Sequence, residues 1–185
     1  MAKTQYYTAT SIDGYIADQH NSLDWLFEVE DTDNPFAPFF QHVGAFVMGA
    51  TTYEWVLEHD ALLDQPIKWA DYYGDTPAWV FTHRDLPRVP GASLTFVQGD
   101  VRPVHAAMTS VAGDRNIWVV GGGELAGSFA DAGLLDEIIL GVAPVTLGGG
   151  APLLPRRMSS SRLSLRSSEQ RGQFAYLTYE VGPPT

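Results

Sequence analysis

The sequence predicts one α/β domain spanning residues 1–185, with a mostly parallel central sheet and an antiparallel edge at its C-terminal end. Short apolar runs alternate with segments of helical period, an order typical of parallel strands joined by helices. Glycine or small polar residues directly follow several of these runs, as expected where a strand ends. Apolar residues make up 45% of the chain and charged residues 18%, which provides a core and excludes disorder as the main state.

Apolar periodicity and turn residues predict the order of the elements. A first strand over residues 6–12 ends in a turn at Asp13-Gly14, and three phenylalanines at helical spacing predict a core-facing helix over 36–42. Thr51 and Thr52 stand where the N-cap of the next helix is expected. The other predicted strands cover residues 15–17, 45–48, 78–81, 94–97, 117–120, 137–142 and 174–181, and the other predicted helices cover 51–57, 103–111 and 124–132. The buried face of the helix over 103–111 is predicted to hold Val104, Ala107, Met108 and Val111.

Charge and composition exclude several functional classes. The net charge of -11 repels phosphate backbones, so no nucleic-acid partner is expected. The chain has no cysteine, which excludes disulfides, thiolate nucleophiles and Cys-ligated metals. Its five histidines show no paired spacing, so no metal site is expected. With neither an apolar signal core nor a run approaching the roughly 20 apolar residues of a membrane span, we expect a cytoplasmic protein without a membrane partner.

Residue types that hold phosphate groups follow three of the predicted strands. The segments 49–52 and 121–124 each lead from a buried strand into a helix through glycine, and residues 82–84 are Thr, His and Arg. Parallel strands place their carboxyl ends at one edge of a sheet, and a helix that starts there offers N–H groups to a pyrophosphate. Residues 121–126 also satisfy the GxGxxA pattern. Tight strand-to-helix turns are the alternative for each glycine alone, but the three strand ends together predict a dinucleotide site.

An ordered set of motifs points to a family. The motifs are SIDGYIA at 11–17, NSLDWL at 21–26, VMGATTYE at 47–54, IWVVGGGEL at 117–125 and PVTLGGG at 144–150. With them the chain resembles the dihydrofolate-reductase-like superfamily, and within it the C-terminal reductase domain of the bifunctional riboflavin deaminase–reductase. The resemblance covers nearly the whole chain and implies a three-layer fold that binds NADPH, with NADH also possible. It further implies a homodimer.

The resemblance also implies which residues contact the cofactor. It assigns nicotinamide and ribose contacts to Ala9, Ile16 and Ala17, pyrophosphate contacts to Gly49, Ala50, Thr51, Thr52, Gly121, Gly122, Gly123, Glu124 and Leu125, with Val120 beside them, and adenosine contacts to Phe81, Thr82 and His83, with Gln98 as a further candidate. Arg84 is the candidate for the 2′-phosphate. Relatives commonly carry basic residues where this chain has Ala50 and Thr51, which leaves the choice between NADPH and NADH open.

The substrate pocket is predicted at Asp24, Trp25, Phe36 and Phe40. Dihydrofolate reductases hold the pterin with a carboxylate on the helix that corresponds to 36–42, and this chain has none there, so folate is not the expected substrate. For Asp24, and for Glu28 and Asp33, the alternative is a solvated loop; for the three aromatic residues it is the core. Five late arginines either bind an anion or form a solvated edge that discourages aggregation: Arg156, Arg157, Arg162, Arg166 and Arg171.

The predicted function is an NADPH-dependent oxidoreductase that transfers hydride to a small heterocyclic substrate, pteridine- or pyrimidine-like, or to a carbonyl. One alternative is the 5-amino-6-ribosylamino-uracil-phosphate reductase of riboflavin synthesis, and another is a nucleotide-binding module without catalysis. The sequence assigns no catalytic residue, since the proton donor can be a bound water or an acid that contacts the substrate.

Overall fold

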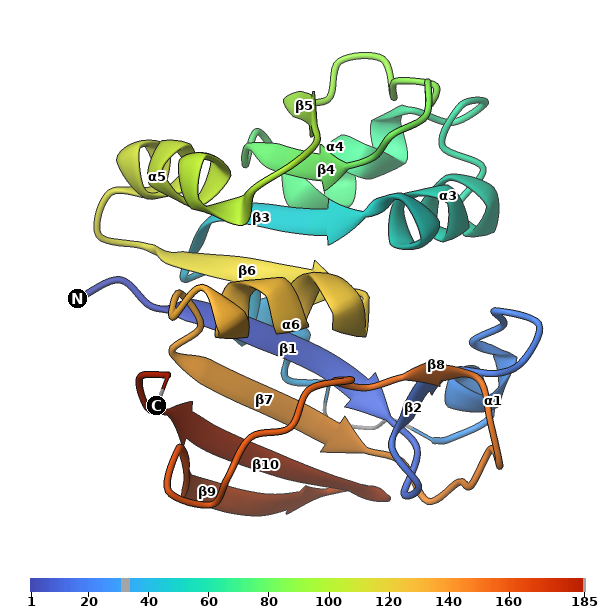
Figure 1. The fold of residues 1–185 in the computed structure, drawn as a ribbon. Coiled ribbons are helices and arrows are strands. Elements are labelled where there is room, and N and C mark those ends of the chain that lie inside the picture. Colours follow the sequence, from blue (N-terminus) through green and yellow to red (C-terminus); the bar gives the residue numbers. More distant parts are fainter. Residues whose placement is uncertain (31–33, 185) are drawn as a thin grey trace.

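An eight-stranded sheet with helices on both faces forms the frame of the molecule (Figure 1). The computed structural model describes residues 1–30 and 34–184. The strands follow the order β5-β4-β3-β6-β1-β7-β10-β9. The pairs from β5 through β7 are parallel, and β10 pairs antiparallel with both β7 and β9. This confirms the predicted parallel sheet with an antiparallel C-terminal edge.

The bounds of the elements are as follows. The strands of the main sheet are β1 (Thr4–Thr10), β3 (Val43–Gly49), β4 (Ala78–Phe81), β5 (Leu94–Val97), β6 (Asn116–Gly121), β7 (Glu137–Val142), β9 (Leu163–Arg171) and β10 (Phe174–Val181). A separate antiparallel pair consists of β2 (Tyr15–Ala17) and β8 (Ala151–Pro152). The helices are α1 (Asp24–Phe27), α2 (Phe36–Phe40), α3 (Ala50–His59), α4 (Ile67–Tyr73), α5 (Val101–Ala112) and α6 (Gly123–Asp131).

Two apolar cores lie on opposite faces of the sheet because side chains alternate along each strand. On β3, Ala45 and Val47 pack with α5 and α6, whereas Phe46 and Met48 pack with α2, α3 and α4. Trp118 of β6 joins the second core. Helices on both faces therefore cover the parallel strands with apolar side chains. Among the described residues, no helix has the length and apolar character needed to cross a membrane.

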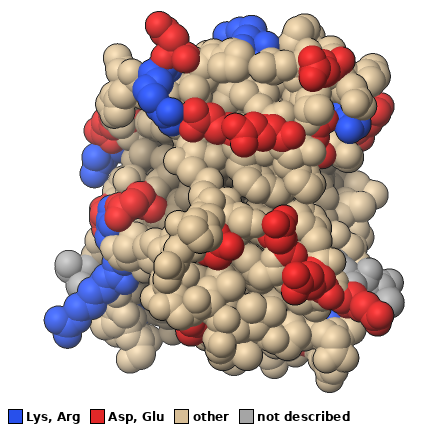
Figure 2. All heavy atoms as spheres, turned by 90° about the vertical axis from the view of Figure 1, so that its right-hand side faces the viewer, with Lys and Arg blue, Asp and Glu red and all other residues tan. Residues whose placement is uncertain are grey.

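The carboxyl ends of the central strands meet at one edge of the sheet, on the right of Figure 1. Gly49 at the end of β3 is in register with Phe81 of β4, and Met48 with Gly121 of β6. The three strand ends singled out in the sequence are therefore neighbours in space. Figure 2 shows this edge face on, and acidic side chains reach the middle of the view whereas the basic ones lie towards its margins.

Three local expectations are corrected by the structure. The N-cap of α3 is Gly49 and its side-chain cap is absent, so Thr51 and Thr52 lie within the first turn. The buried face of α5 holds Val101, Val104, Met108 and Ala112, which share one stripe at the helical period. Ala107 and Val111 lie to one side of this stripe and are exposed. Strand β9 and helix α4 were not predicted at all, since neither has a clear apolar period.

Two of the late arginines fit the interpretation as a solvated, charged edge, because carboxylates of the same chain bind them. On the exposed strand β9, Arg166 forms an ion pair with Glu180. Arg156 lies 2.7 Å from Asp131 and 2.9 Å from Glu124. These guanidinium groups are neutralised by carboxylates of the same chain.

Candidate functional site

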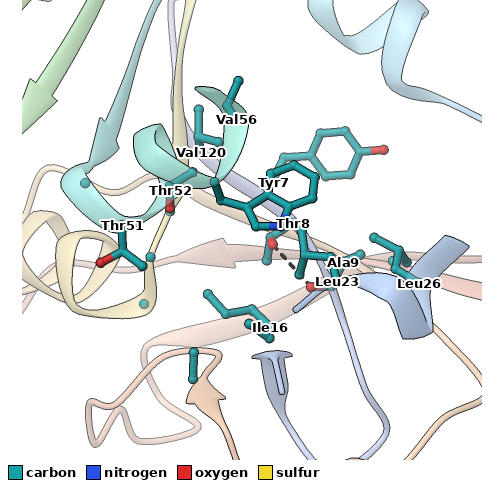
Figure 3. A pocket seen from close by; sticks show the side chains of 18 of the residues that line it. Tyr7, Thr8, Ala9, Ile16, Leu23, Leu26, Thr51, Thr52, Val56 and Val120 are labelled. Atoms are coloured by element: carbon teal, nitrogen blue, oxygen red, sulfur yellow. Dashed lines mark hydrogen bonds between the residues drawn. The ribbon is translucent and has the colours of Figure 1, made fainter. Parts of the chain in front are cut away.

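A cavity of about 990 Å³ lies at this edge of the sheet, at the upper end of the roughly 300–1,000 Å³ that small-molecule sites occupy. Figure 3 shows Thr51 and Thr52 on one side of it, Leu23 and Leu26 on the other, and Ile16 between them. The predicted residues that line it are Ala9, Ile16, Ala17, Phe36, Gly49, Ala50, Thr51, Thr52, Val120, Gly121, Gly122, Gly123, Glu124 and Leu125. The structure thus brings together the nicotinamide and pyrophosphate residues that the resemblance implies.

Two helices begin at the cavity without side-chain caps. Helix α3 starts after Gly49 and α6 starts after Gly122, and neither N-cap residue offers a side-chain acceptor to the N–H groups of the first turn. Helix α5, which also begins at this edge but does not line the cavity, is capped by Asp100, whose carboxylate accepts from the N–H of Arg102 at 3.0 Å. The first N–H groups of a helix have no partner within it. At α3 and α6 these donors and the positive helix ends are therefore available to an anion.

The backbone or its close packing requires glycine at some positions of the cavity but not at others. Gly121 has φ of +143°, which disfavours other residues, and a Cβ on Gly123 would lie 2.4 Å from the carbonyl oxygen of Pro152. Gly49 has extended backbone angles, φ −80° and ψ 167°, that any residue adopts. The nearest atom to a Cβ there would be the carbonyl oxygen of Gly121 at 3.7 Å, an ordinary contact. Neither the backbone nor packing requires glycine at position 49, which fits a position kept small for a ligand.

A turn and a short ribbon form the wall around Ile16 and Ala17. Asp13 accepts hydrogen bonds from the Ser11 hydroxyl at 2.6 Å and from the N–H of Gly148 at 2.7 Å. These bonds, that of Ser11 first, lower the pKa of Asp13 to about 2, so its carboxylate stays charged at neutral pH. Asp13 thereby ties the turn before β2 to the loop before β8, in agreement with its turn interpretation.

The residues implied for the adenosine end lie beside the cavity, outside its lining. Phe81 neighbours Gly49 across the β3–β4 pair. The Nδ1 atom of His83 lies 3.2 Å from the Oε1 atom of Gln98. The guanidinium of Arg84 makes two hydrogen bonds to Glu54, at 2.9 and 2.8 Å. This side chain is therefore held by α3, and its charge is already matched by a carboxylate.

The predicted substrate residues are largely placed elsewhere. Trp25 is buried against Ala143 and Phe174, and Phe40 packs in the core against Trp118, so the core interpretation applies to both. Asp24 begins α1 and does not line the cavity. Thr82, the remaining adenosine candidate, bonds locally to the N–H of Arg84. Asp33 lies outside the described residues.

Several aromatic residues of the lining were not predicted. Tyr7, Trp55, Tyr73, Trp118 and Tyr176 all border the cavity. Strand alternation gave a usable signal for the residues on strands, because Tyr7 and Trp118 have neighbours in sequence that pack on the opposite face of the sheet. Burial, and then the nearby Asp60 and Tyr72, raises the pKa of Tyr73 to about 12. Its phenol is therefore protonated at neutral pH.

Comparison with known proteins gives a consistent family signal. Residues 2–176 match the RibD C-terminal domain. The chain is 35% identical over 178 residues to the uncharacterized protein YwjB of Bacillus subtilis, which covers 96% of this chain and 97% of that protein. A candidate riboflavin biosynthesis protein from Shewanella sp. PV-4 has a TM-score of 0.78 at 29% identity, covering 98% of this chain and 99% of that one.

Two more distant structures share the fold. The diaminohydroxyphosphoribosylaminopyrimidine deaminase/5-amino-6-(5-phosphoribosylamino)uracil reductase of Thermotoga maritima has a TM-score of 0.63 at 16% identity and covers 97% of this chain and 56% of that one. The dihydrofolate reductase of Enterococcus faecalis, complexed with NADP(H), has a TM-score of 0.55 at 13% identity and covers 97% of this chain and 96% of that one. The dihydrofolate-reductase-like architecture predicted from the sequence is confirmed.

Proposed function

This chain belongs to the RibD C-terminal domain family, and on that premise we propose that it is an NADPH-dependent reductase of a small heterocyclic or carbonyl substrate. The observation that carries the proposal is the meeting of two helix N-termini without side-chain caps, those of α3 and α6, at one large cavity. A pyrophosphate bridges two such donor sets well, because each supplies N–H groups and a positive dipole end.

The residues present fit a dinucleotide. Backbone N–H groups after Gly49 and Gly122 would hold the phosphates. Because Gly49 has no side chain, a phosphate could approach the backbone closely there. Ile16 and Ala17, fixed through the ribbon that Asp13 ties down, would cover the nicotinamide ring. When bound, the cofactor supplies the hydride. The protein's part is to orient the reactants and to exclude water with an apolar lining.

Two further functions remain distinct alternatives. A reductase of 5-amino-6-(5-phosphoribosylamino)uracil, the activity named for the Thermotoga maritima protein, is tested by complementation of a riboflavin auxotroph. A nucleotide-binding module without catalysis predicts tight NADPH binding with no oxidation of NADPH when acceptors are supplied.

The test of the proposal is a pair of titrations with NADPH and with NADH, followed by quenching of tryptophan fluorescence. Trp55 and Trp118 line the cavity, so their emission reports its occupation. We expect saturable quenching with NADPH, and weaker binding of NADH if a group at the adenosine end recognises the 2′-phosphate. Lack of binding of both dinucleotides would reject the proposal and leave the fold assignment intact.

A further inference from the structure

The part of the cavity beyond the cofactor residues is an aromatic pocket. Phe36 of α2 lies with its ring centroid 5.2 Å from that of Trp118 and 6.5 Å from that of Tyr7. From α1 and α3, Phe27 and Trp55 add a second, parallel pair with centroids 6.3 Å apart and planes 10° apart. All five side chains line the cavity. Rings arranged in this way favour a flat ring compound, which can stack on their faces or meet their edges.

One of these rings is exposed in a way that suits a ligand. Phe27 is 59% exposed although it borders the cavity. Exposed apolar surface at the mouth of a cavity gains free energy when a ligand covers it. Leu26 of the short helix α1 and Leu23 at its N-cap add apolar surface to the same wall, and Asn21 and Asn34 add uncharged polar side chains to the lining.

The charges around the cavity disfavour an anionic substrate. All eleven Lys and Arg residues and all five histidines lie in the described ranges 1–30 and 34–184, and none of them lines the cavity. Residues 31–33 are Asp, Thr and Asp and bring no basic group to the chain. The one charged side chain in the described part of the lining is the carboxylate of Glu124. Acidic side chains also reach the middle of the surrounding face (Figure 2).

The basic residues near the edge of the cavity are engaged elsewhere. Arg84 is bound by Glu54, and Arg156 is bound by Glu124 and Asp131. A phosphate of the substrate would have to break such a pair to gain a cation. Arg171 lies over the ring of Tyr176 and is bound by Glu169. His59 stacks on Phe27 and Trp55, with centroids 5.1 and 4.4 Å away, from outside the lining. The helix N-termini at Gly49 and Gly122 are the positive groups in the described lining itself, and in the proposed function the cofactor's phosphates take them.

We infer that the substrate is a flat, uncharged ring compound held by the aromatic pocket, and that phosphorylated compounds are disfavoured there. The inference rests on the proposed function, because it assigns the helix N-termini to the cofactor. It narrows the substrate class to neutral heteroaromatic or quinone-like rings. Phe36 becomes the side chain that selects for a ring.

A matched pair of probes tests this inference: 1-naphthol and 1-naphthyl phosphate, which share one ring system and differ in the phosphate. Isothermal titration calorimetry on NADPH-saturated protein should give a Kd for 1-naphthol at least tenfold lower than that for 1-naphthyl phosphate. Equal or tighter binding of the phosphate ester would overturn the inference, and so would a lack of 1-naphthol binding.

Two variants of the same helix complete the test. Phe36→Leu removes a ring that lines the cavity, and we expect 1-naphthol affinity to fall between about twofold and tenfold, the range for loss of one aromatic pair. Phe39→Leu is the control, since Phe39 also packs on Trp118, at 5.8 Å, but does not line the large cavity. It should leave 1-naphthol affinity unchanged. Equal effects of the two variants would contradict the role of Phe36.

The outcomes separate the two proposals. If NADPH binds and 1-naphthol does not, the cofactor assignment stands and the substrate inference fails. If NADPH does not bind, the proposed function fails, and the dependence of 1-naphthol binding on Phe36 in the protein alone still decides whether the aromatic pocket takes a ring.

Discussion

Replacement of Gly49 by aspartate should stabilise the protein while it weakens cofactor binding. The backbone at Gly49 is extended, and a Cβ there meets nothing closer than 3.7 Å. Loss of glycine's freedom in the unfolded chain is worth about 0.4–1 kcal/mol, and an aspartate in place of glycine at an N-cap adds a few tenths. For a chain of 185 residues, a gain of ~1 kcal/mol raises Tm by roughly 2–4 °C.

In the proposed function the same carboxylate would oppose the phosphates of the cofactor. Two like charges about 5 Å apart repel by about 3 kcal/mol at an effective dielectric constant of 20. We therefore expect Gly49→Asp to weaken NADPH binding at least 100-fold, which is about 2.7 kcal/mol. Gly49→Ala should weaken it less, because it adds bulk without charge. The assays are thermal unfolding without ligand and the fluorescence titration with NADPH.

Helix α5 supplies the control. Asp100→Ala removes the cap of a helix that starts outside the cavity, which should lower Tm and leave NADPH affinity unchanged. Wild-type affinity in Gly49→Asp would show that the start of α3 does not hold the phosphates. A lower Tm in Gly49→Ala would show instead that packing requires the glycine.

Three further changes follow from particular contacts. Gly123→Ala should lower stability by roughly 1–3 kcal/mol, measured by denaturant unfolding, since its Cβ would lie 2.4 Å from the Pro152 oxygen; unchanged stability would contradict this close approach. Asp13→Asn should lower Tm at pH 7, and this deficit should vanish as the pH falls towards 2. The folded protein lowers the pKa of Asp13 from 3.8 to about 2, so the stability that the carboxylate contributes is complete above about pH 4 and is lost as the pH falls towards 2. A deficit independent of pH would rule out the carboxylate as its source. Glu54→Gln should free the guanidinium of Arg84 and raise the ratio of NADPH to NADH affinity, whereas Arg84→Ala should lower it; a ratio that neither variant moves would remove Arg84 as the 2′-phosphate contact.

The fold was predictable where one feature of the sequence decided one element. The apolar runs of β4 and β6 and the glycines after β3 and β6 predicted strands and turns that the structure confirms. Strand β9 escaped prediction because seven of its nine residues are exposed, so it has no apolar period. Its place is set by pairing with β10, a long-range contact that no local pattern carries.

The site divides in the same way. Its predicted cofactor half is built from backbone. Local sequence predicts directly where a strand ends, where a helix starts and that Gly49 has no side chain. The aromatic half is built from side chains of α1, α2, α3, β1 and β6, and which of them converge depends on how helices pack across the sheet. Trp25 and Phe36 illustrate the difficulty, because both are aromatic residues near the same loop, yet one is buried in a core and the other lines the cavity.

This division also has a consequence for how such a site can change. A substitution at Phe36 or Trp55 alters the shape of the aromatic pocket without touching the backbone donors after Gly49 and Gly122. Under the proposed function, the affinity for a dinucleotide and the choice of substrate would therefore rest on separate groups of atoms. Variants of the aromatic residues should change the Kd of ring compounds with little change in that of NADPH, and variants at the glycines should do the reverse.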